Sequence, residues 1–172
     1  MQVAGVRGRP RWARLERVTE TTAGVAQRQR VAAYAVCVRA GRVLLARWVP
    51  LDGSPPRWTM PGGGIDHGED PYDAVIREVR EETGYEFRPT RLLGMDSLRL
   101  TDDDGAAFHG LRVVYTGEIV GGELRYEVGG STDRAEWFDL DAVTELDRVG
   151  LVDIALALYR DRPATGSLTA SV

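Results

Sequence analysis

Three glutamates stand at a spacing that could bind a metal ion. Glu78, Glu81 and Glu82 lie three and four residues apart, so on a helix they would share one face. Like charges at this spacing oppose helix formation by roughly 0.2–0.5 kcal/mol per pair, and burial increases the penalty because the effective dielectric falls. Carboxylates gathered behind a glycine loop, here Gly62–Gly64, are ligands that Mg²⁺ and Mn²⁺ prefer. The alternative is a solvated acidic face that neighbouring arginines partly neutralise.

The residues around these glutamates predict a helix from about Pro71 to Thr83. Asp70 can cap the free backbone N–H groups at its start, and proline suits the first helical position. Gly84 is a natural left-handed stop at its end. Val75 and Val79, one turn apart, would form the buried stripe, so the glutamates fall on another face.

The stretch from Gly63 to Tyr85 resembles the signature of the Nudix hydrolases, G-x5-E-x7-R-E-U-x-E-E-x-G-U, in which U is a bulky apolar residue. The one mild departure is the last U position, which is usually aliphatic and is Tyr85 here. The flanking strand pattern extends the resemblance to about residues 31–160. Every position other than U is matched, by Gly63, Glu69, Arg77, Glu78, Glu81, Glu82 and Gly84.

This resemblance implies a reaction and a set of roles. Family members cleave a pyrophosphate bond in a nucleoside diphosphate linked to another group, by attack of water on phosphorus with help from a divalent cation, Mg²⁺ or Mn²⁺. Glu78 and Glu82 are expected to bind the metal. Glu81 is expected to be a further ligand or the base that activates water. The carbonyl oxygen of Gly63 is expected to be another ligand.

Two more residues of the signature are expected to support the cluster. Arg77 would orient the glutamates through a bidentate pair, which a lysine could not copy. Glu69 would not bind the metal itself but would support the residues that do. The alternative for Glu69 is a capping or surface acid.

Family members often add an acid from outside the signature. The candidates are Glu127, Asp133 and the acidic loop at 102–104, and we prefer Asp133 and Glu127. Arg47 ends an expected strand near the site and could contact a phosphate; the alternative is a surface charge. Trp58 could stack on a base, although a tryptophan beside a strand is more often part of the core.

Other residues with reactive side chains are read as structural. Trp137, like Trp58, could stack on a base but is more often a core residue. Cys37 sits in an apolar run and is expected in the core. His67 and His109 have no partner at metal-ligand spacing, so a loop and a surface position are expected.

Composition excludes several classes of protein. The single cysteine among 172 residues excludes an internal disulfide framework and a cysteine zinc site. The absence of lysine excludes a P-loop lysine and a Schiff base. A net charge of −4 gives no overall attraction to nucleic acid. There is no apolar run long enough for a membrane span and no signal peptide, so we expect a soluble cytoplasmic protein without a membrane partner.

Three regions are expected along the chain: an arginine-rich arm at 1–30, a Nudix hydrolase domain at 31–162 and a flexible tail at 163–172. The arm carries a net charge of +5, from seven arginines and two acids, whereas the remainder carries −9. It is expected to be a flexible or loosely docked segment. The alternatives are an anchor on the domain or on a homodimer mate, and a guide for a polyphosphate or RNA substrate.

The remaining pattern predicts strands around two helices. Residues 31–38 form an apolar run typical of a buried strand, with 42–49 as its hairpin partner. Further strands are expected at 57–60, 88–100, 108–120 and 135–140, a short one at 123–127, and a second helix at 149–160. This order favours an α/β (α+β) fold. The resemblance implies the same, as a Nudix-like α/β/α sandwich with a central mixed sheet.

The substrate is the least determined feature. Members that act on ADP-ribose usually carry a proline 15 or 16 residues beyond the signature, where this chain has Leu100 and Thr101. The patterns of coenzyme A-type and NADH-type members are also absent. We therefore expect a small-molecule nucleotide, a (d)NTP or a related compound. The alternative function is a catalytically silent Nudix-like module that senses a ligand or binds RNA, and the complete set of glutamates favours the enzyme.

Overall fold

The computed structural model describes residues 17–20, 26–101, 105–127 and 129–168. The acidic loop at 102–104, most of the arginine-rich arm and the last four residues of the tail lie outside the described residues. Within the described part of the chain, no helix is long and apolar enough to cross a membrane.

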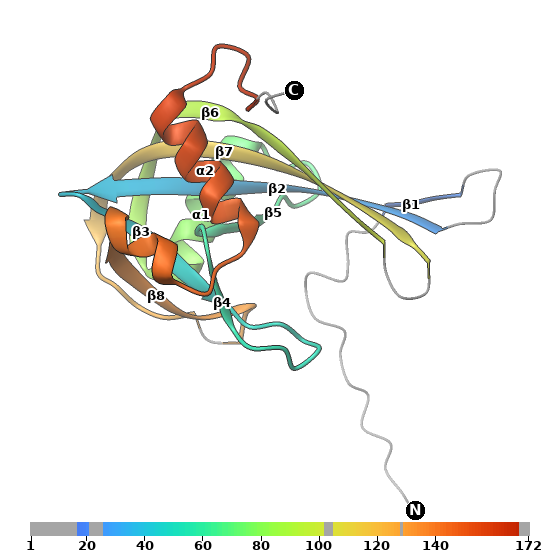
Figure 1. Cartoon of the computed structure of the whole chain (residues 1–172), viewed down its shortest axis with the longest axis horizontal. Coiled ribbons are helices and arrows are strands. Elements are labelled where there is room, and N and C mark those ends of the chain that lie inside the picture. The colour runs from blue at the N-terminus through green and yellow to red at the C-terminus, as the bar shows by residue number, and fades with distance from the viewer. Residues whose placement is uncertain (1–16, 21–25, 102–104, 128, 169–172) are drawn as a thin grey trace, which may run out of the picture.

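The described residues form eight strands, two α-helices and one 3-10 helix, drawn in Figure 1. The order along the chain is β1 (Arg17–Glu20), β2 (Ala26–Arg39), β3 (Arg42–Trp48), β4 (Arg57–Thr59), β5 (Gly62–Gly64), α1 (Pro71–Thr83), β6 (Tyr85–Thr101), β7 (Ala107–Gly122), β8 (Thr132–Asp139), η2 (Leu140–Glu145) and α2 (Gly150–Asp161).

Strand β2 is the centre of the sheet. It pairs with β7 in parallel and with β1, β3 and β5 in antiparallel. The sheet continues from β3 to β4 and β8, and from β7 to β6. The sheet is therefore mixed, as the sequence predicts.

Helices cover both faces of this sheet. On one face, Ala33, Ala35 and Cys37 of β2 pack in a core that includes Val75 and Val79 of α1. On the other face, Val36 of β2 packs in a second core with residues of α2, among them Leu151, Val152, Ala155 and Leu158. This alternation along β2 follows from the two-residue period of a strand. The predicted α/β/α sandwich is confirmed.

The long helix forms where the sequence predicts it, from Pro71 to Thr83. The second helix is also confirmed, at Gly150–Asp161, one residue later than expected. The short strand expected at 123–127 is wrong, because these residues have no strand partner. Instead the backbone N–H of Arg125 donates to the carbonyl of Thr83 at 2.9 Å, which holds this segment against the end of α1.

Strand β2 begins well before the apolar run that predicts it. Five residues ahead of Val31 already belong to the strand, and Gln27 to Arg30 pair with β7. The distal parts of β2, β6 and β7 extend together away from the helices (Figure 1). Hydrophobic periodicity could not find this extension because its residues from Gln27 to Arg30 are polar. The pairing with β7 brings Arg30, which the sequence assigns to the arm, into the sheet.

Candidate active site

Helix α1 positions the three glutamates because its two ends are fixed. The side chain of Asp70 accepts a hydrogen bond from the backbone N–H of Tyr72 at 2.8 Å. At the other end Gly84 adopts a left-handed conformation with φ of 74°, and its N–H donates to Arg80. Between these ends, Val75 and Val79 are fully buried against the sheet. The glutamate face of the helix is thereby turned toward strand β5.

The glycines of β5 let charged side chains approach its backbone from both sides. A Cβ atom on Gly63 would lie 2.6 Å from Oε2 of Glu78, and one on Gly64 would lie 2.8 Å from Nη2 of Arg30. A Cβ atom on Gly62 would overlap the carbonyl oxygen of Ala33, and its φ of 143° disfavours other residues. Strand β5 is therefore a bare strip of backbone between the helix and β2.

Arg77 connects the charged groups. Its Nε and Nη2 donate to the two carboxylate oxygens of Glu69 at 2.8 and 2.7 Å. Its Nη1 donates to Glu78 at 2.7 Å and to Glu81 at 3.3 Å, and its Nη2 also reaches the carbonyl of Gly64 at 3.0 Å. These contacts raise the pKa of Arg77 above its ordinary value and lower that of Glu69. Arg77 thus fixes the orientation of three carboxylates at once.

Glu82 is the most deeply buried acid of the site, with 3% of its surface exposed. Its Oε2 accepts a hydrogen bond from the backbone N–H of Gly62 at 2.9 Å. Burial raises its pKa well above the ordinary value, and the charges of Glu78 and Glu127 raise it further, whereas the bonds from Gly62 and the Thr132 hydroxyl lower it. A carboxylate here is under strong pressure to take up a proton or a cation.

Glu78 and Glu81 lie in different environments. The Glu78 side chain is 15% exposed, and burial raises its pKa, against the lowering effect of Arg77. The Glu81 side chain is 45% exposed. The site therefore has two buried carboxylates, Glu78 and Glu82, one turn apart on α1, and a more exposed one beside them.

The donors fit a hard divalent cation. Among the described residues, no three His, Cys, Asp or Glu side chains stand close enough together to form a complete metal cage. Mg²⁺ does not require one, because it keeps several water molecules and binds through one or two carboxylates together with substrate phosphates. Glu78 and Glu82 provide two buried carboxylates with raised pKa values. A bound cation would remove the cost of their charge.

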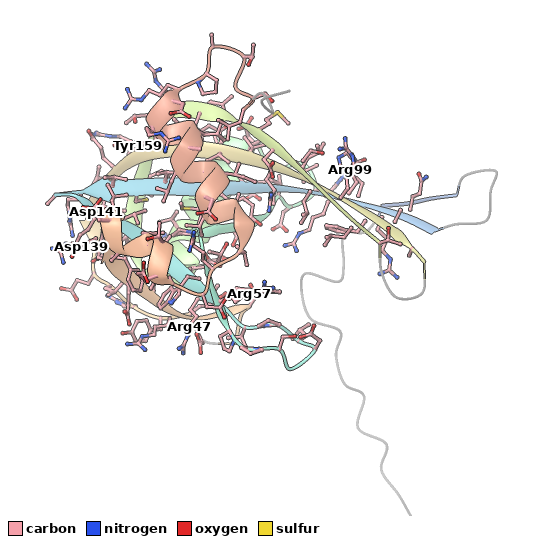
Figure 2. The ribbon with its side chains drawn as sticks, in the orientation of Figure 1. Arg47, Arg57, Arg99, Asp139, Asp141 and Tyr159 are labelled. Carbon is pink, nitrogen blue, oxygen red and sulfur yellow. The ribbon has the colours of Figure 1, made fainter. Side chains whose placement is uncertain are left out.

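Of the two preferred acids outside the signature, Glu127 lies nearer the cluster. Its charge acts on Glu82, and its Oε2 accepts hydrogen bonds from the hydroxyl and the backbone N–H of Thr132 at 2.8 and 3.2 Å. Asp133 instead forms a bidentate pair with Arg47, whose Nε and Nη2 donate at 2.8 Å each. The pair lies on β3 and β8, and Figure 2 labels Arg47 near Arg57 of the neighbouring β4.

The two tryptophans considered for base stacking have structural contacts. The ring of Trp58 packs edge-on against Phe138 with ring centroids 4.6 Å apart. The indole N–H of Trp137 donates to the Tyr85 hydroxyl at 3.2 Å, and the guanidinium of Arg39 lies 4.7 Å from its ring. Both side chains are partly buried against the cores.

Within the described residues, neither the histidines nor the cysteine belong to a group of three or more potential metal ligands. His67 is exposed in the loop before α1. The ring of His109 is 2.7 Å from the hydroxyl of Ser97, on the distal part of the sheet. Cys37 is buried, and burial raises the pKa of its thiol to about 12, so the thiol is unreactive at neutral pH.

Sequence reasoning missed the residues that β2 and its neighbours bring to the site. Arg30 and Tyr34 of β2 flank β5 on the side opposite α1. Next to them, Nε of Arg112 donates to Asp96 at 2.6 Å across β7 and β6. All four residues from Gln27 to Arg30 are polar, so the sequence has no apolar alternation there that could have shown the early start of β2.

Comparison with known proteins places this arrangement in a family. The protein-family model described as "NUDIX domain" matches residues 27–155. A NUDIX hydrolase from Nitrosomonas europaea superposes with a TM-score of 0.64 at 28% identity, covering 77% of this chain and 89% of that one. A MutT NUDIX hydrolase from Burkholderia pseudomallei gives a TM-score of 0.59 at 31% identity, covering 76% and 97%.

Curated relatives match over shorter stretches. An ADP-ribose pyrophosphatase from Methanocaldococcus jannaschii is 36% identical over 89 residues, which is 52% of this chain and 50% of that protein. An RNA pyrophosphohydrolase from Rhizobium meliloti is 55% identical over 47 residues, or 27% of this chain and 28% of that protein. The chain thus spans half or less of the length of these relatives.

Proposed function

Because the chain belongs to the Nudix family, we propose that it hydrolyses a phosphoanhydride bond in a nucleoside diphosphate derivative with the help of Mg²⁺ or Mn²⁺. Nudix hydrolases generally use divalent metal ions. The observation that carries the proposal is the buried pair of Glu78 and Glu82, whose carboxylates have raised pKa values beside the bare backbone of β5. Such a pair is costly without a cation and well suited to one.

Each residue of the cluster has a role in the proposed reaction. Glu78 and Glu82 bind the cation, with the carbonyl of Gly63 as a further ligand. Glu81, the most exposed of the three, accepts a proton from the attacking water or adds a ligand. A divalent cation there would neutralise phosphate oxygens and lower the pKa of that water.

The surrounding residues keep these groups in position. Arg77 holds Glu78 through the hydrogen bond at 2.7 Å and is itself held by Glu69. Glu127 is the acid outside the signature that assists, because its charge acts on Glu82. Asp133 is the weaker candidate, since its carboxylate is bound to Arg47.

For the substrate, we propose a (d)NTP or a related nucleotide. The missing proline at Leu100 and Thr101 argues against the ADP-ribose pattern. The relatives named as ADP-ribose and RNA pyrophosphohydrolases make ADP-ribose and the triphosphorylated end of RNA the compounds to test against it.

A metal-supplemented substrate screen tests this function. Nucleoside triphosphates, ADP-ribose, sugar nucleotides, dinucleoside polyphosphates and triphosphorylated or capped RNA are incubated with Mg²⁺ or Mn²⁺, and released products are identified. We expect release of phosphate, pyrophosphate or a nucleoside monophosphate that stops when the metal is chelated. Glu82→Gln should remove most of the activity, whereas Asp73→Asn, which removes an exposed charge on the same helix, should retain it.

Two outcomes would contradict the proposal. One is full activity in Glu82→Gln, which would separate hydrolysis from the buried pair. The other is an absence of product from every compound in a protein that still binds one of them. That second result would identify a catalytically silent binding module.

A further inference from the structure

The arginines around the site differ in whether their guanidinium groups already have ion-pair partners. Arg77 is bound to three glutamates. Arg112 is paired with Asp96, and Arg47 is paired with a carboxylate on β8. Arg30 has no hydrogen-bond or ion-pair partner within the described parts of the chain, although its side chain is half-buried in the sheet. A guanidinium carries five donors, and no described protein group accepts a hydrogen bond from those of Arg30.

The position of Arg30 relates it directly to the carboxylates. Its Nη2 lies 2.8 Å from the place that a Cβ atom of Gly64 would take, whereas Glu78 lies 2.6 Å from the corresponding place on Gly63. Successive residues of a strand face opposite sides. Arg30 and Glu78 therefore flank the same short strand from its two sides, and their charges act on each other, since Arg30 lowers the pKa of Glu78.

Tyr34 lies on the same side of β2 as Arg30. Its ring covers Gly62, where an added Cβ atom would lie 2.8 Å from Cδ1 of the tyrosine. Burial raises the pKa of its hydroxyl, which also feels the charges of Arg30 and Glu82. Within the described residues the Tyr34 hydroxyl has no hydrogen-bond partner. Every fully buried side-chain polar atom in those residues does have a partner, so this hydroxyl is not fully buried. Its O–H is therefore an unused donor, which a ligand could accept.

We propose that Arg30, together with the hydroxyl of Tyr34, forms a phosphate-binding subsite across β5 from the metal-binding glutamates. This inference deepens the proposed function and rests on it, since it concerns the polyphosphate of the same substrate. A guanidinium binds phosphate through two parallel hydrogen bonds, and a neighbouring hydroxyl can donate a third.

The excess of negative charge at the site is a reason for a cation that contacts the phosphates. Glu69, Glu78, Glu81 and Glu82 all carry carboxylates close to β5, and Arg77 is fully engaged with them. A polyphosphate approaching this cluster would be repelled even when a divalent cation is bound. Arg30 is a cation beside the cluster whose donors are not taken by those acids. It is thus a substrate-positioning residue, distinct from the groups that bind metal or activate water.

Three substitutions test the subsite. Arg30→Gln removes the charge, Arg30→Lys keeps it without the planar fork, and Tyr34→Phe removes only the hydroxyl. The matched control is Arg42→Gln, which removes an exposed arginine at the start of β3, where it pairs with Arg39 at the far end of β2. Each variant is assayed for kcat and KM on the best substrate of the screen. Each is also titrated calorimetrically with inorganic pyrophosphate and with a methylene-bridged nucleotide in the presence of Mg²⁺.

We expect Arg30→Gln to raise KM and to weaken pyrophosphate binding by roughly 10- to 100-fold, the usual effect of a hydrogen-bonded charge, with kcat changed much less. Arg30→Lys should fall between this variant and the wild type. Tyr34→Phe should weaken binding by about 3- to 10-fold, and Arg42→Gln by less than about twofold. Unchanged melting temperatures would show that the variants fold.

The two hypotheses fail in different ways. If the wild type hydrolyses no nucleotide, the proposed function fails, while a loss of pyrophosphate binding in Arg30→Gln still supports the subsite. The subsite is overturned if Arg30→Gln binds pyrophosphate as the wild type does. It is also overturned if the wild type does not bind pyrophosphate, or if only kcat and the melting temperature fall.

Discussion

Helix α1 and strand β2 both bring charged side chains to the glycine strand β5, but they do so by different means. On the helix, Arg77 donates hydrogen bonds to Glu78 and Glu81, whereas Glu82 accepts one from the backbone N–H of Gly62. Strand β2 carries Arg30, which has no such partner in the described structure. The helix therefore supplies carboxylates that already have hydrogen-bond donors, and the strand supplies a guanidinium whose donors no described group accepts. We therefore propose that α1 provides the groups for the chemistry and β2 a group for substrate binding.

The largest expected effect comes from replacing Arg77. Arg77→Lys keeps the charge but cannot reproduce hydrogen bonds to Glu69, Glu78, Glu81 and Gly64 together. Breaking such a network should lower kcat by roughly 100- to 1,000-fold. Steady-state kinetics of Arg77→Lys and Arg30→Lys, measured side by side, compares their effects on kcat and KM. Arg30→Lys should affect mainly KM. Equal losses of kcat in both variants would remove the distinction between helix and strand.

Two substitutions in strand β5 should separate an effect on stability from an effect on activity. Gly62→Ala should destabilise the protein by about 2–5 kcal/mol, because the new Cβ atom meets backbone and the φ of 143° is unfavourable. Gly63→Ala meets only the end of the Glu78 side chain, so it should preserve most of the stability and lower activity by about 10-fold or more. Urea unfolding and activity assays of both variants test this order. A stable Gly62→Ala variant would contradict the close approach of β5 to β2.

Substitutions of Glu127 and Asp133, the two acids outside the signature, should have smaller effects on kcat that differ from each other. Glu127→Gln should lower kcat by about 10-fold, because its charge acts on the buried Glu82. Asp133→Asn should change kcat by less than about threefold, because its carboxylate is bound to Arg47. Kinetics at saturating metal compares them directly. A larger loss in Asp133→Asn would reverse the assignment.

The smallest expected effect is a change in how stability depends on pH. Burial raises the pKa of Glu82 above its ordinary value of 4.5, so in the folded protein the carboxyl keeps its proton to higher pH than in the unfolded chain. Without metal, its contribution to stability is complete below pH 4.5 and is lost as the pH rises through the raised value. Glu82→Gln should flatten this fall, and metal should reduce it in the wild type.

Free energies of unfolding from urea titrations between about pH 4 and 8, with the metal chelated, measure this dependence. The matched control is Glu123→Gln, which changes an exposed glutamate and should leave the slope unaltered. The same slope in Glu82→Gln as in the wild type would show that the buried carboxyl is not the group responsible.

The sequence by itself determined helix α1 and its charged face. Asp70, Pro71 and Gly84 are local signals that act within one turn of the helix ends, and the spacing of the glutamates follows from the helical period. Both are properties of neighbouring residues, so they could be predicted without knowing any partner. The mixed sheet between helices was predictable for the same reason, from the order of its apolar runs.

Only the tertiary structure decided which distant residues meet this helix. Arg30 and Tyr34 reach β5 because β2 pairs with β5 and β7 at once, and Glu127 approaches Glu82 because the segment after β7 is held at Thr83 and Thr132. Asp133 is drawn to Arg47 by the pairing of β3 with β8. These contacts join residues far apart in the chain and depend on strand register, which polar residues without apolar periodicity do not encode.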